Sequence, residues 1–367
     1  MQQQQKDKKL PQVPGVIIDI DGVLIKGKEG IQRSREGLEL LSKTFNELNG
    51  QKFGVENRQK IQFTTLTNCG GNLEKNHAEI INQKMGIERE EFRIKAEETI
   101  LNFTPLRAKI SEFVEAGKLI CVGGSLNYLD IVEDMGIQLY ITFEEFAYCF
   151  PFVLAHPNYE PEVVEATRKR VAERLGLGED YDWRKTLQVH GMFLLYEPEC
   201  QEICIQVIMD LCTTEDGRIS EVYPFEKPKE HIPLYIVNND LVYKDAMPLP
   251  RLAFGSFNLA LQTCAKKLHN MDLNITFYGK PQPVAFEYAT EHIRNKNKEV
   301  EISNFYMIGD NPQSDIKGAN EAGIISILVK TGVYQGEEPP TDIVPKYFVN
   351  DFYDAIQLIM KLEGIIE

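Results

Sequence analysis

The chain has 367 residues, of which 43% are hydrophobic, and it carries a formal net charge of −15. This length predicts two domains, and the composition is that of an ordinary globular protein. The excess of acidic residues argues against a nucleic-acid partner, because contacts to phosphates require clustered Lys and Arg. An anionic substrate therefore has to be attracted by a metal ion and by local cations instead of by the molecule as a whole.

Three features of the sequence bear on the compartment. No run of 18 apolar residues that would span a membrane is present. Residues 1–9 are polar and contain no arginine, which is unlike a secretory signal or a mitochondrial presequence. The seven cysteines are an odd number in a long chain and do not indicate a disulfide framework, which favours a reducing compartment. We expect a cytoplasmic protein without a membrane span.

The first part of the chain alternates between strand and helix patterns. Residues 16–18 are an apolar run that predicts a buried strand, and residues 34–48 follow as an amphipathic helix. A second strand is predicted over 61–67, and a second helix over 73–86 closes at a glycine. This order of elements predicts a parallel sheet.

The middle of the chain predicts a separate α/β unit, which at about 150 residues is large enough to have its own core. Strands are expected over 119–122, 191–196 and 233–237, and helices over 126–135, 161–176 and 199–212. The first pattern then returns, with helices over 256–269, 283–298, 315–322 and 352–363 and strands over 305–308 and 324–329. We therefore predict a Rossmann-like parallel-sheet core made of residues 1–111 and 259–367, interrupted by an inserted α/β cap domain over residues 112–258.

Reactive side chains follow four predicted strands of the core at their carboxyl ends. In chain order they are Asp19 and Asp21, Thr67 and Asn68, Lys280, and Asp310 with Asp315. Ligands of an open parallel sheet bind in the crevice beyond these ends, so we expect the side chains to share one site. Carboxylates that lie together need a cation or raised pKa values. Phosphoryl transfer needs a nucleophile, cations around the phosphate oxygens and an acid for the leaving group, and each of these has a candidate here.

A hard divalent cation is the expected cofactor of this site. Mg²⁺ takes oxygen ligands at ~2.0–2.1 Å and keeps several of its waters. The carboxylates of Asp19 and Asp310 and the main-chain carbonyl of Asp21 can supply the protein ligands. Asp315 is also a candidate N-cap of the helix predicted over 315–322, and it can serve both purposes.

Four motifs resemble, in order, those of the haloacid dehalogenase (HAD) superfamily: Asp19-Ile-Asp-Gly-Val-Leu, Leu66-Thr-Asn68, Gly279-Lys-Pro281 and Gly309-Asp-(x4)-Asp315. The resemblance spans the whole chain, and the inserted domain resembles the C2 cap of subclass IIA. Further features look like the cat eye syndrome critical region branch, also called HAD-like hydrolase domain-containing protein 5. They are Gly27, Ile31, Asn238-x-Asp240, Pro248-x-Pro250-Arg251, Gly255, Met307-Ile-Gly-Asp-Asn-Pro-x-Ser-Asp and Thr331-Gly-Val-Tyr334. Relatives in this branch are often mitochondrial, so the mitochondrial matrix is the alternative location.

The resemblance implies the catalytic roles. Asp19 is the expected nucleophile, forming an aspartyl-phosphate that divides one difficult step into two easier ones. Asp21 is expected to protonate the leaving oxygen and then to activate water, which requires a raised pKa of its carboxyl. Lys280 is expected to neutralise the aspartyl-phosphate and to hold Asp19.

The resemblance also implies the binding roles. Thr67, the main-chain amide of Asn68 and the turn that contains Gly22 are expected to bind phosphate oxygens, together with Lys280. Asp19, Asp21 and Asp310 are expected to bind Mg²⁺. Asp315 is expected to act behind them, by orienting a metal-bound water or the ammonium of Lys280.

Three functions remain open at this point. We expect a Mg²⁺-dependent phosphatase for a small phosphorylated metabolite, because a cap over the crevice disfavours a protein substrate. Transfer of the phosphoryl group to an acceptor other than water would use the same residues. The third possibility is a binding or assembly module with weak or no activity, either a homodimer through the cap or a part of a larger assembly. Substrate specificity is expected in the cap, near residues 196–199 and 238–240.

Overall fold

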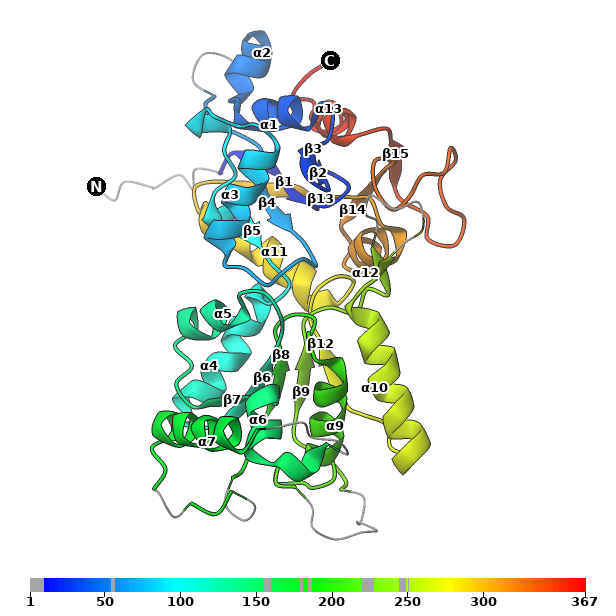
Figure 1. Cartoon of the computed structure of the whole chain (residues 1–367). Helices are drawn as coiled ribbons and strands as arrows, with labels where there is room; N and C mark the ends of the chain where they lie inside the picture. Colours follow the sequence, from blue (N-terminus) through cyan, green and yellow to red (C-terminus); the bar gives the residue numbers. More distant parts are fainter. Residues whose placement is uncertain are drawn as a thin grey trace, which may run out of the picture.

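The computed structural model describes residues 10–53, 57–154, 160–178, 181–183, 187–219, 228–243, 249 and 251–367. The predictions made on residues 1–9, on Pro248 and on Pro250 lie outside these ranges. The chain forms two α/β domains, drawn one above the other in Figure 1, and each is built on its own parallel sheet. Among the described residues, the helices are all too short or too polar to cross a membrane.

The upper domain in Figure 1, the core domain, contains a six-stranded sheet in the order β15-β14-β13-β1-β4-β5, with every neighbouring pair parallel. Its strands are β1 (Gln12–Ile18), β4 (Gln62–Leu66), β5 (Thr99–Ile100), β13 (Glu301–Gly309), β14 (Ile325–Val329) and β15 (Tyr347–Val349). β1 lies between β4 and β13, and all but its first residue are buried. A strand that is covered on both faces requires such a continuous apolar run.

Helices cover both faces of the core sheet. One face packs against α1 (Ser34–Ser42), α3 (Glu74–Lys84) and α13 (Phe352–Leu362), and the other against α11 (Pro283–Lys296) and α12 (Lys317–Glu321). The helix predicted over 34–48 is in fact two helices, α1 and α2 (Phe45–Phe53), because Lys43 takes an extended backbone conformation. The short elements of this domain are β2 (Ile25–Lys26), β3 (Glu29–Gly30), η1 (Glu90–Phe92), η2 (Ala96–Glu98) and the π-helical turn η5 (Pro312–Ile316).

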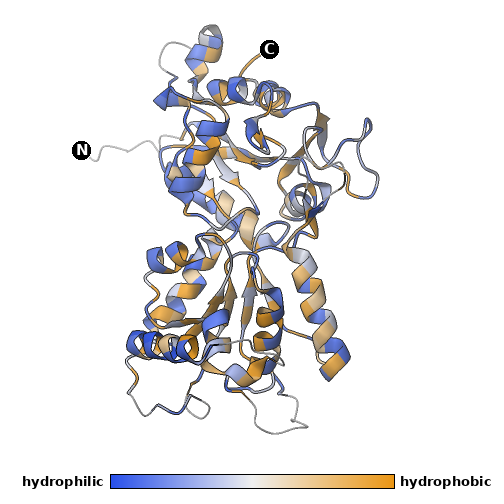
Figure 2. Ribbon diagram, viewed as in Figure 1, coloured by the Kyte–Doolittle hydropathy of each residue, from blue (hydrophilic) through white to orange (hydrophobic). Residues whose placement is uncertain are grey.

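The lower domain, the cap domain, contains a five-stranded parallel sheet in the order β12-β9-β8-β6-β7. Its strands are β6 (Ile120–Gly123), β7 (Tyr140–Thr142), β8 (Met192–Leu194), β9 (Leu234–Ile236) and β12 (Ile275–Phe277). Its described helices are η3 (Thr104–Leu106), α4 (Arg107–Glu115), α5 (Tyr128–Asp134), α6 (Phe143–Cys149), η4 (Pro151–Val153), α7 (Pro161–Leu175), α9 (Gln201–Leu211) and α10 (Phe254–His269). A separate antiparallel hairpin pairs β10 (Val242–Tyr243) with β11 (Arg251–Leu252). Figure 2 shows the strands as apolar and the outer helical faces as polar.

The cap domain extends beyond the predicted range of 112–258 at both ends. Phe103 and Leu106 already belong to its hydrophobic cluster, and α4 begins at Arg107. At the other end, Phe257 of α10 is fully buried in the same cluster, and β12 pairs with β9 of the cap sheet. The chain therefore returns to the core only after β12, and the boundary at residue 258 was placed too early because α10 and β12 complete the cap instead of opening the core.

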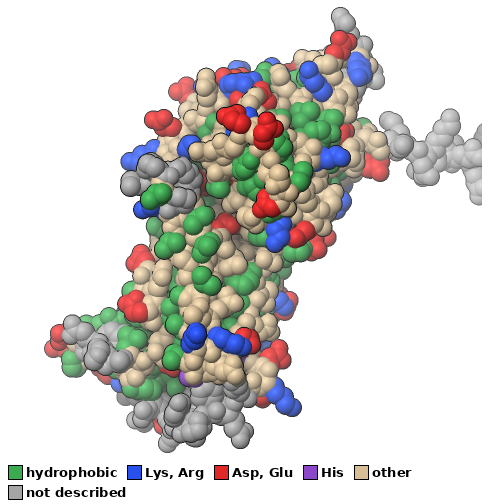
Figure 3. Space-filling model, turned by 90° about the vertical axis from the view of Figure 1, so that its right-hand side faces the viewer, with side chains coloured by type: hydrophobic (Ala, Val, Ile, Leu, Met, Phe, Trp, Pro, Cys, Tyr) green, Lys and Arg blue, Asp and Glu red, His purple; other side chains and the backbone are tan. Residues whose placement is uncertain are grey.

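The carboxyl ends of the two sheets face each other. Residues that follow β1, β4 and β13 of the core line one pocket together with residues that follow β8 and β9 of the cap. Figure 3 shows the side of the molecule on which α10 lies, with charged side chains of both signs mixed over the core domain and hydrophobic side chains towards the middle. Exposed apolar residues of the hairpin and α10 include Val242, Tyr243, Leu249, Leu252, Leu259 and Leu268.

Candidate active site

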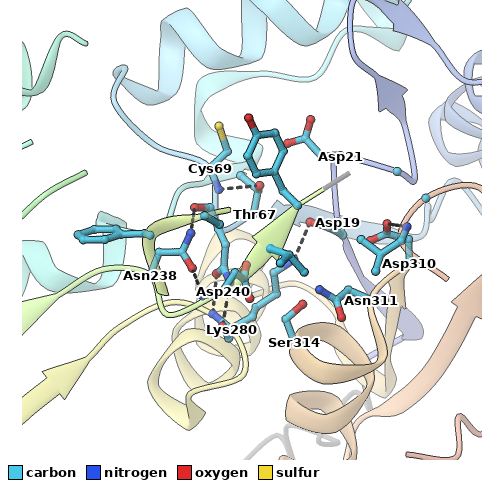
Figure 4. A pocket seen from close by; sticks show the side chains of 18 of the residues that line it. Asp19, Asp21, Thr67, Cys69, Asn238, Asp240, Lys280, Asp310, Asn311 and Ser314 are labelled. Carbon is cyan, nitrogen blue, oxygen red and sulfur yellow. Dashed lines mark hydrogen bonds and ion pairs between the residues drawn. The ribbon is translucent and has the colours of Figure 1, made fainter. Parts of the chain in front are cut away.

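A pocket of about 390 Å³ lies between the two domains. This volume is typical of a site for a small molecule. The structure brings all the sequence-predicted residues to it, although they come from positions that are up to 296 residues apart in the chain. Asp19, Asp21, Gly22, Thr67, Asn68, Lys280 and Asp310 line the pocket (Figure 4), and Asp315 is fully buried behind it.

The ammonium of Lys280 links two carboxylates at the base of the pocket. Its Nζ donates hydrogen bonds to Oδ1 of Asp19 and to Oδ1 of Asp315, both at 2.6 Å. All three side chains are buried. Burial alone would lower the pKa of Lys280, but the two carboxylates outweigh it and raise the pKa, so the lysine keeps its charge. The predicted contact between Lys280 and Asp19 is therefore present.

Asp315 reaches the site indirectly, as expected. Besides accepting a hydrogen bond from Lys280, it accepts main-chain hydrogen bonds through Oδ2 from Asp310 (3.2 Å) and Asn311 (3.0 Å). Both of its oxygens are thus used within the protein. It lies within η5, where it holds the turn that follows β13.

Asp310 sits against two glycine turns. Its Oδ2 accepts a hydrogen bond from the main-chain N–H of Val333 at 2.5 Å. A Cβ atom at Gly22 or at Gly332 would lie only 2.2 or 1.8 Å from the same oxygen, so both positions need glycine for the carboxylate to approach. Burial raises the pKa of Asp310 well above its ordinary value, and repulsion from Asp19 and Asp315 adds to the shift.

The donor set fits a divalent cation. Asp19, Asp310 and Asp315 each place a carboxylate oxygen within 4.8 Å of the others, and the single ammonium of Lys280 balances only one of these charges. Burial raises the pKa of Asp19 as well, and repulsion from Asp21 adds to it, against the opposing effect of Lys280. Hard cations prefer oxygen ligands of this kind. The carboxylate of Asp21 is not part of the cluster, so its predicted share in metal binding would fall to its main-chain carbonyl.

The side chain of Asp21 faces the pocket on the side of Cys69 in Figure 4, away from Lys280. The loss of surrounding water between the domains raises the pKa of Asp21, although the residue keeps exposed surface, while Lys84 and Lys280 act in the opposite direction. A raised pKa favours the protonated carboxyl, which is the form that a general acid needs. The role of Asp21 as a general acid stays a prediction.

The residues predicted to bind phosphate differ in which of their polar groups remain available. Thr67 Oγ1 accepts a hydrogen bond from the N–H of Cys69 at 3.0 Å, which leaves the proton of its hydroxyl free to point into the pocket. Gly22 differs from the prediction, because its N–H donates to the carbonyl of Ile25 at 2.8 Å and is not available to a phosphate. Because Gly22 has no side chain, Asp310 can approach it closely, and its backbone adopts a left-handed conformation with φ of 86°.

The side chain of Asn68 connects the two domains by hydrogen bonds. Its Oδ1 accepts from the N–H of Lys280 at 2.7 Å, and its Nδ2 donates to the carbonyl of Lys280 and to Oδ2 of Asp240, both at 2.8 Å. These contacts occupy the side chain, so the predicted binding of a phosphate by Asn68 would fall to its main-chain N–H. The carbonyl of Asn68 accepts hydrogen bonds from Asn102 (3.0 Å) and Asn238 (3.2 Å). Sequence reasoning missed Asn102, because β5, which it follows, is only two residues long.

Two family models match the chain. The model described as haloacid dehalogenase-like hydrolase matches residues 16–138, and the model described as HAD-hydrolase-like matches residues 277–355. The two matches contain all the residues predicted for the site. They leave out most of the cap domain, which also separates the two halves of the site in the chain.

Two relatives are similar over most of the chain. A mitochondrial hydrolase of Saccharomyces cerevisiae is 25% identical over 92% of this chain and 93% of its own length. A cardiolipin synthase (CMP-forming) / mitochondrial hydrolase fusion protein of Schizosaccharomyces pombe is 27% identical over 88% of this chain. The match covers only 49% of the fusion protein, so the chain spans about half the length of that relative.

Solved structures share the fold. A p-nitrophenyl phosphatase from Archaeoglobus fulgidus covers 95% of this chain and 100% of its own, with a TM-score of 0.57 and 15% identity. A glycerol phosphate phosphatase from Mycobacterium tuberculosis, solved in complex with magnesium, covers 93% of this chain and 75% of its own, with a TM-score of 0.51 and 15% identity. The narrower assignment to the cat eye syndrome critical region branch stays a prediction.

Proposed function

Because this chain belongs to the haloacid dehalogenase superfamily of hydrolases, we propose that it is a Mg²⁺-dependent phosphatase acting on a small phosphomonoester. One observation carries this proposal. Lys280 holds the carboxylates of Asp19 and Asp315 at the base of a pocket, and Asp310 lies close enough to share a cation with Asp19. The magnesium complex of a structural neighbour supports the choice of metal.

In the first step, an oxygen of Asp19 attacks the phosphorus atom. The bond from phosphorus to the ester oxygen breaks, and Asp21 gives its proton to that oxygen as the alcohol leaves. Thr67, the main-chain N–H of Asn68 and the ammonium of Lys280 hold the phosphate oxygens. The product on the protein is an aspartyl-phosphate on Asp19.

In the second step, the carboxylate of Asp21 takes a proton from a water molecule, and the resulting hydroxide attacks the phosphorus atom. The phosphorus–oxygen bond to Asp19 breaks, phosphate leaves, and both aspartates return to their starting forms. Asp19, Asp310 and the main-chain carbonyl of Asp21 would hold Mg²⁺, which when bound supplies positive charge beside the phosphate. Asp315 contributes by positioning Lys280.

The size of the pocket points to a metabolite. At about 390 Å³ and with the cap domain across it, the pocket suits a small ester. The same residues would serve transfer of the phosphoryl group to an acceptor other than water. The names of the two relatives favour the mitochondrial alternative for the location of this chain over the cytoplasm.

The test is release of the alcohol from 4-nitrophenyl phosphate by the purified full-length chain. We expect turnover that requires Mg²⁺, stops with a chelator and is lost in Asp19→Asn. Asp272→Asn is a matched control, because Asp272 is an exposed partner of Lys266 and does not line the pocket. Absence of turnover by the folded protein across a panel of phosphorylated metabolites would contradict the proposal. A stable protein complex that survives Asp19→Asn would then favour the binding module.

A further inference from the structure

The wall of the pocket that belongs to the cap domain is acidic. Its lining residues follow β8 and β9 or belong to the hairpin region, and they are Tyr196, Glu197, Asn238, Asp240, Val242, Tyr243, Ala253 and Phe254. This set contains two carboxylates and, within the described part of the chain, no lysine, arginine or histidine. The cap wall therefore carries carboxylates that no cation among its own described lining residues balances.

Neither carboxylate of this wall is neutralised by an ion pair among the described residues. Glu197 accepts a hydrogen bond from the side-chain amide of Gln201 at 3.3 Å, and burial raises its pKa. Asp240 accepts one from Asn68 at 2.8 Å. Burial raises the pKa of Asp240 to about 6, against the effects of Asn68 and Lys280, so it is ionised at pH 7.5. Both groups therefore offer acceptor oxygens to a ligand.

The cations around the pocket belong to the other wall. Lys280 is engaged by Asp19 and Asp315. Lys26 is exposed at the core side, and its Nζ donates to the carbonyl of Thr331 at 3.2 Å. Among the described residues, an anionic leaving group that extends from the phosphate towards Glu197 would meet no positive charge on the cap wall.

Resting on the phosphatase function proposed above, we infer that the cap wall selects phosphomonoesters whose leaving group carries hydrogen-bond donors and no negative charge, such as polyols and amino alcohols. Hydroxyl and ammonium groups donate to the oxygens of Glu197 and Asp240. A carboxylate or a second phosphate at the same place is repelled by both, and rejection by unpaired like charge is an efficient source of specificity. Tyr196 and Tyr243 offer apolar ring faces to the carbon skeleton.

The experiment compares glycerol 3-phosphate with 3-phosphoglycerate, which differ only in a hydroxymethyl group in place of a carboxylate. For the full-length protein with Mg²⁺, we expect kcat/KM to be at least about tenfold higher for glycerol 3-phosphate. Glu197→Gln should reduce this ratio several-fold, and Glu197→Lys should bring it to one or invert it. Glu202→Gln is the matched control, because Glu202 is exposed and lies outside the pocket lining. It should leave the ratio unchanged.

The two compounds are also measured as competitive inhibitors of 4-nitrophenyl phosphate hydrolysis, so that a preference is visible even where neither is turned over. Stronger inhibition by glycerol 3-phosphate supports the inference. Equal inhibition, no inhibition by either compound, or a preference for 3-phosphoglycerate overturns it while aryl phosphatase activity is intact. If the wild-type protein does not hydrolyse 4-nitrophenyl phosphate at all, the proposed function itself is overturned. The two failures are therefore distinguishable.

Discussion

The core and cap domains are built on the same kind of parallel sheet but bury different side chains. The core encloses the charged groups of Asp19, Lys280 and Asp315 at its strand ends. The cap encloses thiols and aromatic rings, among them Cys204 and the stacked pair of Phe193 and Tyr235, whose ring centroids are 4.7 Å apart. Burying charges costs free energy even when they are paired, whereas burying rings stabilises the fold. The buried charges of the core therefore lower its stability but supply the reactive groups. The buried rings stabilise the cap, which positions Glu197 and Asp240 at the pocket.

The largest effect is expected from Lys280→Met. Without the ammonium, Asp19 and Asp315 repel each other in a buried site, and the expected loss of aryl phosphatase activity is a factor of about 10³ or more, equivalent to ~4 kcal/mol. Thermal unfolding should show a loss of about 3–5 kcal/mol of stability, as for other broken buried ion pairs. Lys266→Met is the control, because the ion pair of Lys266 with Asp272 is exposed. A Lys280→Met protein with a tenth of the normal activity would contradict the assigned role.

A substitution in the aromatic core of the cap domain should lower stability and leave the activity of the folded protein intact, unlike Lys280→Met. Phe193→Ala removes a fully buried ring that contacts Phe113 and Tyr235, and we expect it to destabilise the protein by about 3–5 kcal/mol. The folded fraction should keep Mg²⁺-dependent activity, measured well below the melting temperature. Leu259→Ala, at an exposed position of α10, should change stability by less than about 0.5 kcal/mol. Equal effects of the two substitutions would mean that the cap is not stabilised by its core.

Magnesium should stabilise the core specifically. At a free concentration 100 times its dissociation constant, Mg²⁺ should add about 2.7 kcal/mol to the free energy of unfolding, seen as a rise in the melting temperature. Asp310→Asn should lose this gain and yet be no less stable than the wild type without metal, because the raised pKa of Asp310 means that its charge is unfavourable there. Phe193→Ala should keep the full gain. An equal metal-induced shift in Asp310→Asn would exclude Asp310 as a ligand.

The smallest expected effect is on stability and comes from substituting Asp210, a partly buried carboxyl group of the cap domain. Burial raises the pKa of Asp210 to about 6, although Gln206 donates a hydrogen bond to it at 2.9 Å. A carboxyl whose pKa is raised on folding contributes most stability below its unfolded pKa of 3.8, and this contribution is lost as the pH rises through 6. Asp210→Asn should therefore stabilise the protein at pH 8 by about 1 kcal/mol, after allowance for solvent screening. Denaturant unfolding should show a smaller gain at pH 5, and a destabilised variant at pH 8 would contradict this sign.

Much of the architecture could be predicted from local patterns. The apolar run before Asp19 and the alternation of strands and helices indicated a parallel sheet, and the four strand-end motifs indicated where its ligands lie. The short strands β5, β7 and β15 have two or three residues each and produce no readable periodicity, so they were missed, and β12 was indicated only by the reactive Lys280 that follows it. The end of the cap was misplaced for the same reason, since only the pairing of β12 with β9 shows to which sheet it belongs.

The sequence by itself determined which chemical groups stand at the ends of strands, because apolar runs and the residues that follow them are local features. Only the tertiary structure decided which atoms those groups contact. The side-chain amide of Asn68 is hydrogen-bonded to Lys280 and Asp240, and the N–H of Gly22 is hydrogen-bonded within a turn. The carboxylates of Glu197 and Asp240 in the cap line the pocket. Such contacts join residues that are far apart in the chain, and they depend on how two whole sheets meet, which no local pattern records.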